Sequence, residues 1–226
     1  MHIFFDLDGT LTDSSPGIIR CVNHALVELG HVAVTDDRLR GMIGSPLSRI
    51  FSDVLSCDDE AMLDCAVAAY RVRFNETGIF ENALYPGVAD ALAELCGAGH
   101  TLQIVTAKPA VSARRVAAHF GIDGFFRALH GPELSARECD KADLVGAALE
   151  IAGGDPRAAV MVGDRAVDVL AARQHRVRAV GAGWGYGTRE ELEGAGPEYV
   201  AETVPGLVRW VRSAAFPGLG LRTTPG

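Results

Sequence analysis

The sequence predicts an α/β protein with a doubly wound parallel sheet and a helical segment inserted after the first strand. The 226-residue chain opens with a short apolar run, residues 2–5, which is typical of a central strand covered on both faces. From Tyr85 onward, strand-like and helix-like segments alternate at the spacing of βαβ units. We therefore expect one α/β core, residues 1–14 and 85–226, and one helical cap, residues 15–84.

The expected cap contains three amphipathic patterns and almost no strand signal. In the first, Ser15 is the expected N-cap, Pro16 occupies the first turn, and an apolar stripe runs to Gly30. The other two patterns carry their apolar residues at helical spacing over residues 47–54 and 63–74. The economical interpretation is a bundle of helices placed above the sheet.

The second part of the chain supplies the remaining strands and helices. Five apolar runs predict strands, and six amphipathic stretches between and after them predict helices. The expected strands are residues 101–106, 125–131, 158–164, 176–183 and 198–201, and the expected helices are residues 87–99, 109–121, 140–154, 166–174, 189–196 and 205–215. Residues 216–226 have no periodicity, and we expect them to be disordered.

Composition excludes several classes of partner. The net charge of −8 disfavours binding to nucleic acid or to an anionic membrane, because both would be repelled. The five cysteines form no CxxC pair and are odd in number, so we interpret them as packing residues in a reducing cytoplasm. No basic leader and no apolar window of bilayer length is present, and we expect a soluble cytoplasmic protein.

Polar residues follow the predicted strands at one edge of the sheet, where doubly wound folds bind ligands. Asp6 and Asp8 follow the first strand, Thr106 and Asp164 follow two others, and Lys141 lies just inside a helix. Such a set of carboxylates suits Mg²⁺, while the ammonium and the hydroxyl suit further anionic oxygens. An aspartate can attack phosphorus covalently, and a second carboxylate can move the proton. The pattern therefore predicts phosphoryl chemistry.

The segment DLDGTLTDS, residues 6–14, resembles the first motif, D-x-D-x-T, of the haloacid dehalogenase superfamily of phosphatases. Thr106 resembles its second motif, Lys141 its third, and Gly163-Asp164 with Asp168 its fourth. The segments LRGMIGSPL, YRVRF, ENALYPGV and GWGYGTREEL are similar to the phosphoglycolate phosphatase-like branch, which includes 5′-nucleotidase-like relatives. The resemblance implies a Rossmann-like haloacid dehalogenase core carrying a helical cap.

The resemblance also implies an activity and a metal. It implies a magnesium-dependent phosphomonoester hydrolase that forms an aspartyl-phosphate on Asp6. Asp8 would be the general acid/base, and its backbone carbonyl would bind Mg²⁺ together with the carboxylates of Asp6 and Asp164. Asp168 would lie directly behind these ligands.

The same resemblance assigns the phosphate-binding residues. Thr106 and the neighbouring Ala107 would hold the phosphate, and Lys141 would pair with both the phosphate and Asp6. Asp8 distinguishes the chain from true dehalogenases, whose halide leaving group needs no proton. Thr10 favours hydrolysis over the phosphosugar mutases of the superfamily, which often carry valine there.

Several functions stay open at this point. Phosphoglycolate is the first candidate substrate and a nucleoside 5′-monophosphate the second, with a phosphosugar mutase as a rival enzyme. A phospho-aspartate signalling switch is the rival from another class, although receiver domains are shorter and carry no helical insertion. A scaffold without activity is opposed by the intact motifs. We expect a monomer or a homodimer.

Residues outside the motifs are weaker candidates. Ser45, Arg49, Arg71 and Lys108 could contact the rest of the substrate and so determine specificity. The competing interpretations are a simple turn for Ser45, a solvated helix face for the arginines, and a solvent-directed side chain for Lys108. Asp13 lies past the turn, and we expect it to support the passage into the cap.

Overall fold

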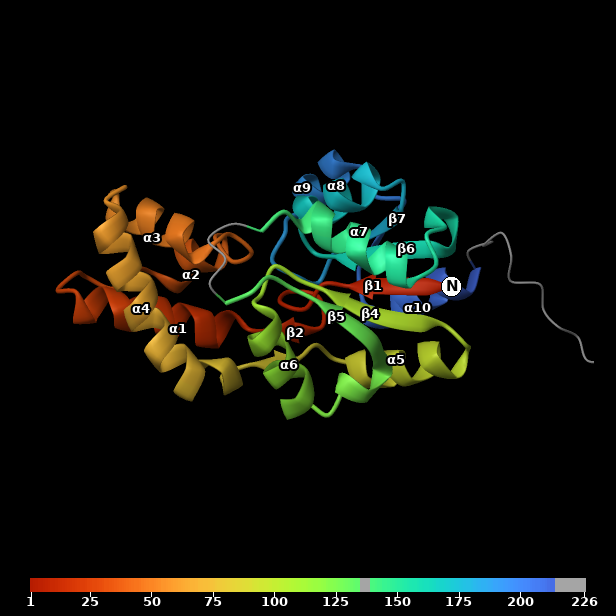
Figure 1. Cartoon of the computed structure of the whole chain (residues 1–226), viewed down its shortest axis with the longest axis horizontal. Helices are drawn as coiled ribbons and strands as arrows, with labels where there is room; N and C mark the ends of the chain where they lie inside the picture. The colour runs from red at the N-terminus through yellow and green to blue at the C-terminus, as the bar shows by residue number, and fades with distance from the viewer. Residues whose placement is uncertain (135–138, 214–226) are drawn as a thin grey trace, which may run out of the picture.

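A six-stranded parallel sheet forms the centre of the molecule (Figure 1). The computed structural model describes residues 1–134 and 139–213. Within these residues the strand order is β5-β4-β1-β6-β7-β8, and all neighbouring strands are parallel. The strands are β1 (His2–Phe5), β4 (Thr101–Val105), β5 (Phe126–His130), β6 (Ala159–Gly163), β7 (Arg178–Ala182) and β8 (Tyr199–Ala201). The first strand therefore lies inside the sheet, as its apolar run predicts.

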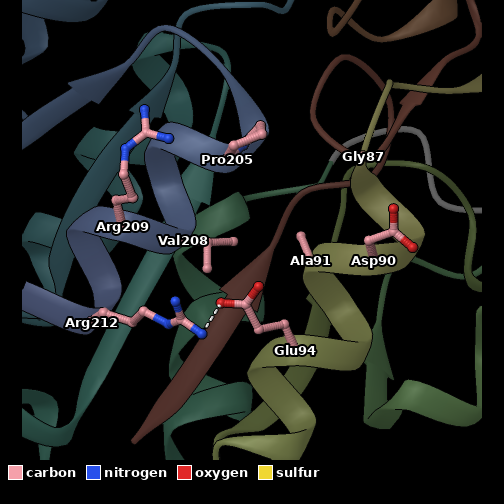
Figure 2. Close-up of a pocket in the computed structure, with 8 residues that line it drawn as sticks. All are labelled: Gly87, Asp90, Ala91, Glu94, Pro205, Val208, Arg209 and Arg212. Atoms are coloured by element: carbon pink, nitrogen blue, oxygen red, sulfur yellow. Dashed lines mark ion pairs between the residues drawn. The ribbon is translucent and has the colours of Figure 1, made fainter.

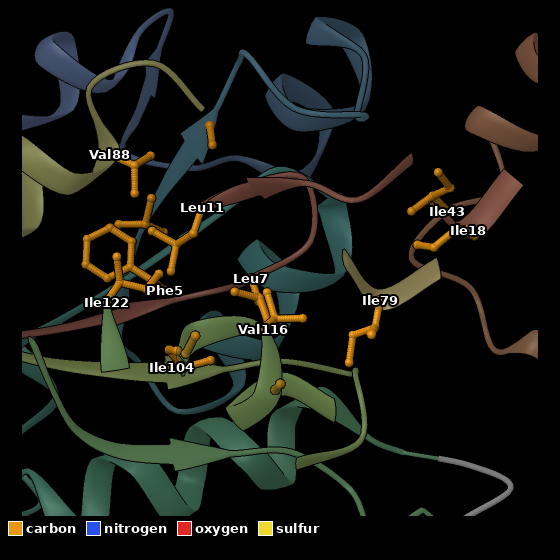
Figure 3. Close-up of a cluster of buried hydrophobic side chains, with 14 of the residues drawn as sticks. Phe5, Leu7, Leu11, Ile18, Ile43, Ile79, Val88, Ile104, Val116 and Ile122 are labelled. Carbon is orange, nitrogen blue, oxygen red and sulfur yellow. The ribbon is translucent and has the colours of Figure 1, made fainter. Parts of the chain in front are cut away.

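Helices cover both faces of the sheet, which confirms the doubly wound fold. One layer contains α5 (Val88–Gly97), α6 (Ala110–His119) and α10 (Val204–Ser213); the other contains α7 (Lys141–Ile151), α8 (Ala166–Gln174) and α9 (Arg189–Ala195). Side chains of β1 alternate between the layers. Ile3 and Phe5 belong to the larger buried cluster, part of which Figure 3 shows, and Phe4 belongs to the smaller one. Two short 3₁₀ turns, η2 (Asp123–Phe125) and η3 (Pro156–Ala158), precede β5 and β6.

The helical insertion leaves and re-enters the core through two short strands. β2 (Thr12–Asp13) pairs antiparallel with β3 (Ala83–Leu84). Between them lie α1 (Ser15–Glu28), α2 (Asp36–Arg40), α3 (Leu47–Leu55), α4 (Glu60–Glu76) and the 3₁₀ turn η1 (Gly78–Phe80). These helices form a cap beside the carboxyl ends of the strands (Figure 1). The two crossing segments, residues 12–15 and 83–85, are called the linkers below.

The start of α1 differs from the prediction by one residue. Ser15 is the first helical residue and Ser14 the N-cap, so the assignment of Ser15 as N-cap was wrong. The backbone N–H of Ser15 donates to Asp13 Oδ1 at 3.1 Å, so Asp13 supports the passage into the cap as expected. Neither α2 nor the β2–β3 pair was predicted, because elements this short carry no periodicity.

The expectations for the C-terminal residues, for membrane-spanning helices and for the cysteines can be compared with the structure. Residues 216–226, predicted to be disordered, lie outside the described residues. No described helix has both the length and the apolarity needed to cross a bilayer. The five cysteines are unpaired, and Cys21 is buried; Cys65, however, is exposed, so the packing role was wrong for that residue.

Candidate active site

The loop after β1 brings two aspartates to the carboxyl edge of the sheet. The backbone N–H of Asp6 donates to Val162 O at 2.9 Å, so Asp6 continues the pairing of β1 with β6. The Leu7 carbonyl then accepts the N–H groups of the three residues 10–12, which turns the chain sharply. Gly9 makes this turn at φ 88°, and a Cβ there would lie 2.2 Å from Asp164 Oδ2. Only glycine therefore allows the loop to approach Asp164 so closely.

Three buried carboxylates meet at this edge. Oxygens of Asp6, Asp164 and Asp168 lie within 4.8 Å of one another, and this group is called the carboxylate cluster below. Lys141, at the start of α7, places Nζ 2.7 Å from Asp6 Oδ1 and forms an ion pair with Asp168. Strand ends far apart in the sequence thus meet where the sequence predicts.

Two members of the carboxylate cluster accept hydrogen bonds from neighbouring residues. Asp164 Oδ1 accepts from Thr10 Oγ1 at 3.2 Å, and its Oδ2 accepts from the Tyr186 N–H at 2.8 Å. Asp168 Oδ2 accepts from the Arg165 N–H at 3.0 Å, which caps α8. Asp168 thus caps α8 and forms an ion pair with Lys141.

The electrostatics of the carboxylate cluster favour a cation. Burial raises the pKa of Asp6 to about 6, although Lys141 opposes the shift. Burial, assisted by the charges of Asp6 and Asp168, raises the pKa of Asp164 to about 8. Three carboxylates face one ammonium, so the ionised group carries two uncompensated negative charges. An all-oxygen donor set with this charge fits a hard divalent cation such as Mg²⁺.

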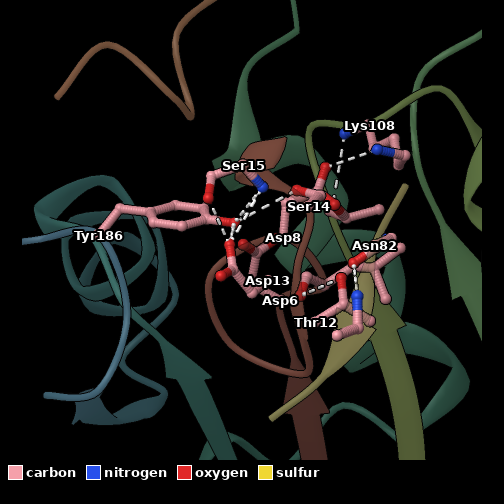
Figure 4. A network of polar contacts seen from close by, with 12 residues as sticks. Asp6, Asp8, Thr12, Asp13, Ser14, Ser15, Asn82, Lys108 and Tyr186 are labelled. Carbon is pink, nitrogen blue, oxygen red and sulfur yellow. Dashed lines mark hydrogen bonds and ion pairs between the residues drawn. The ribbon is translucent and has the colours of Figure 1, made fainter. Parts of the chain in front are cut away.

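Asp8 has a different partner from the carboxylate cluster. Its Oδ2 lies 2.8 Å from Lys108 Nζ, and both side chains are largely buried (Figure 4). Lys108 Nζ also lies 4.9 Å from the ring centroid of Phe74, on α4 of the cap. Asp8 Oδ1 is buried and has no hydrogen-bond partner among the described residues. The second aspartate thus keeps one acceptor oxygen free within the site.

The Lys108 side chain is buried, although most lysine side chains are exposed to solvent. The competing interpretation, a solvent-directed side chain, is wrong, because the Lys108 side chain is only 6% exposed. The chain contains two lysines, Lys108 and Lys141, and both are paired with site aspartates. The sequence composition already set Lys108 and Lys141 apart, because the other 19 of the 21 Lys and Arg residues are arginine.

Thr106 lies at the end of β4, where the prediction placed it. Its N–H donates to His130 O at 2.9 Å, and its Oγ1 accepts from the Lys108 N–H at 3.2 Å. The side chain is 2% exposed, whereas the neighbouring Ala107 is exposed. The Thr106 hydroxyl therefore retains its own proton for donation to an anion.

The weaker cap candidates lie in less specific surroundings. Arg49 is exposed and pairs with Asp53 along α3 at 3.3 Å, as the solvated-face alternative expects. Arg71 Nη2 donates to Leu134 O at 3.0 Å, which joins α4 to the loop after β5. Ser45 is exposed in the loop before α3. None of these three side chains has a described contact with the carboxylate cluster.

Sequence reasoning missed two residues that join the cap to the site. Arg165, next to Asp164, donates from Nη1 to Ile43 O in the cap and from Nε to Glu191 Oε1. Tyr186 bonds Asp164 through its backbone and the first linker through its hydroxyl. The closely spaced glycines of GWGYG, residues 183–187, were the available sequence signal for Tyr186.

A separate hollow lies between α5 and α10 (Figure 2). Its volume is about 290 Å³, and an ion pair between Arg212 and Glu94 at 2.7 Å crosses one end. It is lined by Gly87, Asp90, Ala91, Glu94, Pro205, Val208, Arg209 and Arg212. No predicted site residue is among them.

Comparisons with known proteins agree on the family. Residues 3–182 match the family model described as haloacid dehalogenase-like hydrolase. The chain is 38% identical over 206 residues to a 5′-nucleotidase of Pseudomonas aeruginosa, covering 91% of this chain and 93% of that protein. It is 35% identical over 191 residues to the tyrosine-protein kinase PtkA of Mycobacterium tuberculosis, covering 84% of this chain and 65% of that protein.

Two further matches support the same conclusion. The chain is 31% identical over 191 residues to a phosphoglycolate phosphatase of Agrobacterium fabrum, covering 80% of each. The crystal structure of a predicted phosphatase from Clostridium acetobutylicum has a TM-score of 0.88 and 32% identity, covering 94% of this chain and 98% of that chain. Both the sequence and the whole described architecture, cap included, thus have close counterparts.

Proposed function

The chain belongs to the haloacid dehalogenase-like hydrolases, and on this premise we propose that it is a magnesium-dependent phosphomonoesterase acting on a small phosphorylated metabolite. The observation that carries the proposal is the ion pair between Asp6 and Lys141 inside the carboxylate cluster, with Asp8 two residues further on. A carboxylate fixed by a buried ammonium is suited to attack phosphorus, and a separate carboxylate can handle the proton.

In the first half of the proposed reaction, an Asp6 carboxylate oxygen forms a bond to phosphorus while the bond from phosphorus to the ester oxygen breaks. Asp8 gives its proton to the leaving alkoxide, so the alcohol departs neutral. In the second half, Asp8 takes a proton from water as the water oxygen bonds to phosphorus and the bond from the Asp6 oxygen to phosphorus breaks. Inorganic phosphate leaves, and Asp6 is again a carboxylate.

The remaining site residues would bind the phosphate group and the metal ion. Lys141 and the Thr106 hydroxyl would hold phosphate oxygens, assisted by the backbone of Ala107. Mg²⁺ would be held by Asp6, Asp164 and the Asp8 backbone carbonyl, and when bound it supplies positive charge to the phosphate oxygens. Asp168 would keep Lys141 oriented toward Asp6.

For the substrate we propose phosphoglycolate first and a nucleoside 5′-monophosphate second. The relative from Agrobacterium fabrum supports the first, and the relative from Pseudomonas aeruginosa supports the second. Lys108 favours the first, because its ammonium beside Phe74 offers a partner to a second anionic group. Phosphoglycolate carries such a carboxylate, whereas a nucleoside does not.

The test is phosphate release from a panel containing phosphoglycolate, nucleoside 5′-monophosphates, sugar phosphates and an aryl phosphate, compared by kcat/KM with and without Mg²⁺. We expect metal-dependent release and the highest kcat/KM for phosphoglycolate. Asp6→Asn removes the nucleophile and should abolish release, while Asp90→Asn, an exposed aspartate on α5, serves as the matched control. Turnover retained by Asp6→Asn would contradict the assignment.

Rival activities give different outcomes in the same panel. A stable phosphoprotein without turnover would support a phospho-aspartate switch. Interconversion of sugar phosphates without phosphate release would support a mutase. The similarity to PtkA makes transfer of phosphate from ATP to a tyrosine peptide a further arm, and transfer in place of hydrolysis would replace the proposal.

A further inference from the structure

The loop after β7, residues 183–188, lies against both the loop after β1 and Asp164. Trp184 Nε1 donates to Thr10 O at 3.0 Å, and the Tyr186 N–H donates to Asp164 Oδ2 at 2.8 Å. A Cβ at Gly185 would lie 2.2 Å from Asp164 Cβ, and one at Gly187 would lie 2.0 Å from Asp164 O. These glycines let the loop backbone rest directly on Asp164, so a displacement of the loop displaces that carboxylate.

The side chain of Tyr186 reaches from this loop to the first linker. Its hydroxyl donates to Asp13 Oδ1 at 3.0 Å and accepts from the Ser15 N–H at 3.0 Å (Figure 4). The Ser14 hydroxyl lies 3.4 Å away. Burial raises the pKa of the phenol, so the hydroxyl stays neutral and remains a donor to Asp13.

The second linker meets the same side chain. Tyr85, which follows β3, interacts electrostatically with Tyr186, and its backbone N–H donates to Leu11 O at 3.1 Å. Both linkers between the core and the cap therefore interact with Tyr186. A rotation of the cap must either break these interactions or carry the loop with it.

We propose that Tyr186 is a positioning residue that couples the position of the cap to the position of the Asp164 carboxylate. Its hydroxyl is hydrogen-bonded to Asp13 and Ser15 of the first linker, and its backbone N–H donates to the Asp164 carboxylate. Because coupling between two sites is reciprocal, a cation held by Asp164 should steady the linkers, and a cap held in place should steady Asp164. Tyr186 thereby joins cap closure to metal binding, which extends the proposed function.

The first test measures the linkers in metal-free full-length protein. Tyr186→Phe removes only the hydroxyl and leaves the N–H on Asp164. We expect amide hydrogen exchange in the linkers, residues 12–15 and 83–85, to become about 10-fold faster than in the wild type, while exchange in β1, β4 and β6 stays unchanged. Tyr199→Phe, on β8 away from the linkers, is the matched control and should change neither.

The second test separates coupling from simple support. Mg²⁺ should slow exchange of the linkers in the wild-type protein, and Tyr186→Phe should lose most of this response even at saturating metal. A purely structural tyrosine would change the basal exchange but keep the response. Asp13→Asn combined with Tyr186→Phe should show less than the sum of the two single effects, because both variants remove the hydrogen bond from the Tyr186 hydroxyl to Asp13 Oδ1.

The outcomes are decisive in both directions. Unchanged basal exchange in Tyr186→Phe, a preserved response to Mg²⁺, or additive effects in the double variant would each overturn the coupling. Calorimetry reports whether Mg²⁺ binds at all. If it does not, the proposed metal dependence fails, and the metal-free comparison still decides whether Tyr186 holds the linkers.

Discussion

Replacement of Lys141 by methionine tests the electrostatic account of the site most directly. Lys141 is 5% exposed and pairs with Asp6 and Asp168, and methionine keeps most of its length while removing its charge. The variant leaves the carboxylate cluster without its ammonium. Removing one partner of a buried ion pair costs about 3–5 kcal/mol, because the remaining charge has no compensation. We expect a loss of this size in the free energy of unfolding at pH 8 without metal.

The pH dependence of that loss follows from the pKa shifts. Burial raises the pKa of Asp6 to about 6 in the folded protein, and Lys141 opposes the rise. Without Lys141 the pKa of Asp6 rises further, so the folded variant binds a proton more readily than the unfolded chain does. Its stability therefore falls as pH increases from the unfolded pKa, near 4, through the raised folded pKa. The destabilisation should shrink between pH 8 and pH 5.5, where Asp6 becomes neutral.

The assay is urea denaturation of the wild-type protein and of Lys141→Met with a chelator present, at pH 5.5 and pH 8. Lys141→Arg is the control that retains the charge. Addition of Mg²⁺ at pH 8 should restore more stability to Lys141→Met than it adds to the wild type. A loss below about 1 kcal/mol, or an equal loss at both pH values, would refute the reasoning.

Three other expectations follow from the same site. Asp8→Asn should lower kcat by roughly 100-fold or more with KM little changed, because the amide cannot move the proton; an intact rate would assign the proton to another group. Lys108→Met should lower kcat/KM for phosphoglycolate at least about 10-fold more than for a nucleoside monophosphate, because only phosphoglycolate loses a charge-assisted hydrogen bond to its second anionic group. Equal losses for the two substrates would exclude Lys108 as a specificity residue. Because the pKa of Asp164 is raised to about 8, Mg²⁺ must displace its proton, and the apparent Kd measured by calorimetry should tighten by up to about 10-fold per pH unit between pH 6 and pH 8; a constant Kd would contradict the shift.

Much of the fold was predictable because its signals are local. Apolar runs such as His2–Phe5 and Ala159–Gly163 predict buried parallel strands, and the rule that ligands bind at the carboxyl ends of such strands predicted the meeting of Asp6, Asp164 and Lys141. The resemblance to the haloacid dehalogenase superfamily is confirmed by the family match. The roles of individual site residues remain predictions.

The rest depends on contacts between distant residues. Lys108 and Asp8 are 100 positions apart, so nothing local indicates that they pair. Tyr186 is joined to Asp13 across 173 positions, and its partner is recognisable only once the linkers are placed. The start of α1 was displaced by one residue because Asp13 reaches over Ser14 to the Ser15 N–H, a competition among polar side chains that sequence spacing does not resolve.

The use of lysine in this chain makes the site chemically addressable. Lys108 and Lys141 are the only lysine side chains, and both are buried against aspartates, while arginine supplies the other basic side chains. Burial opposes the charged form of Lys141, but the Asp168 and Asp6 charges outweigh it and keep the pKa of Lys141 raised, so its ammonium resists acylation in the folded protein. Reagents that modify lysine amines thus have no exposed lysine to consume them. The extent to which Lys108 and Lys141 are each modified, and in which order, would therefore report when the site opens and when a ligand occupies it. No engineered label is needed for this measurement.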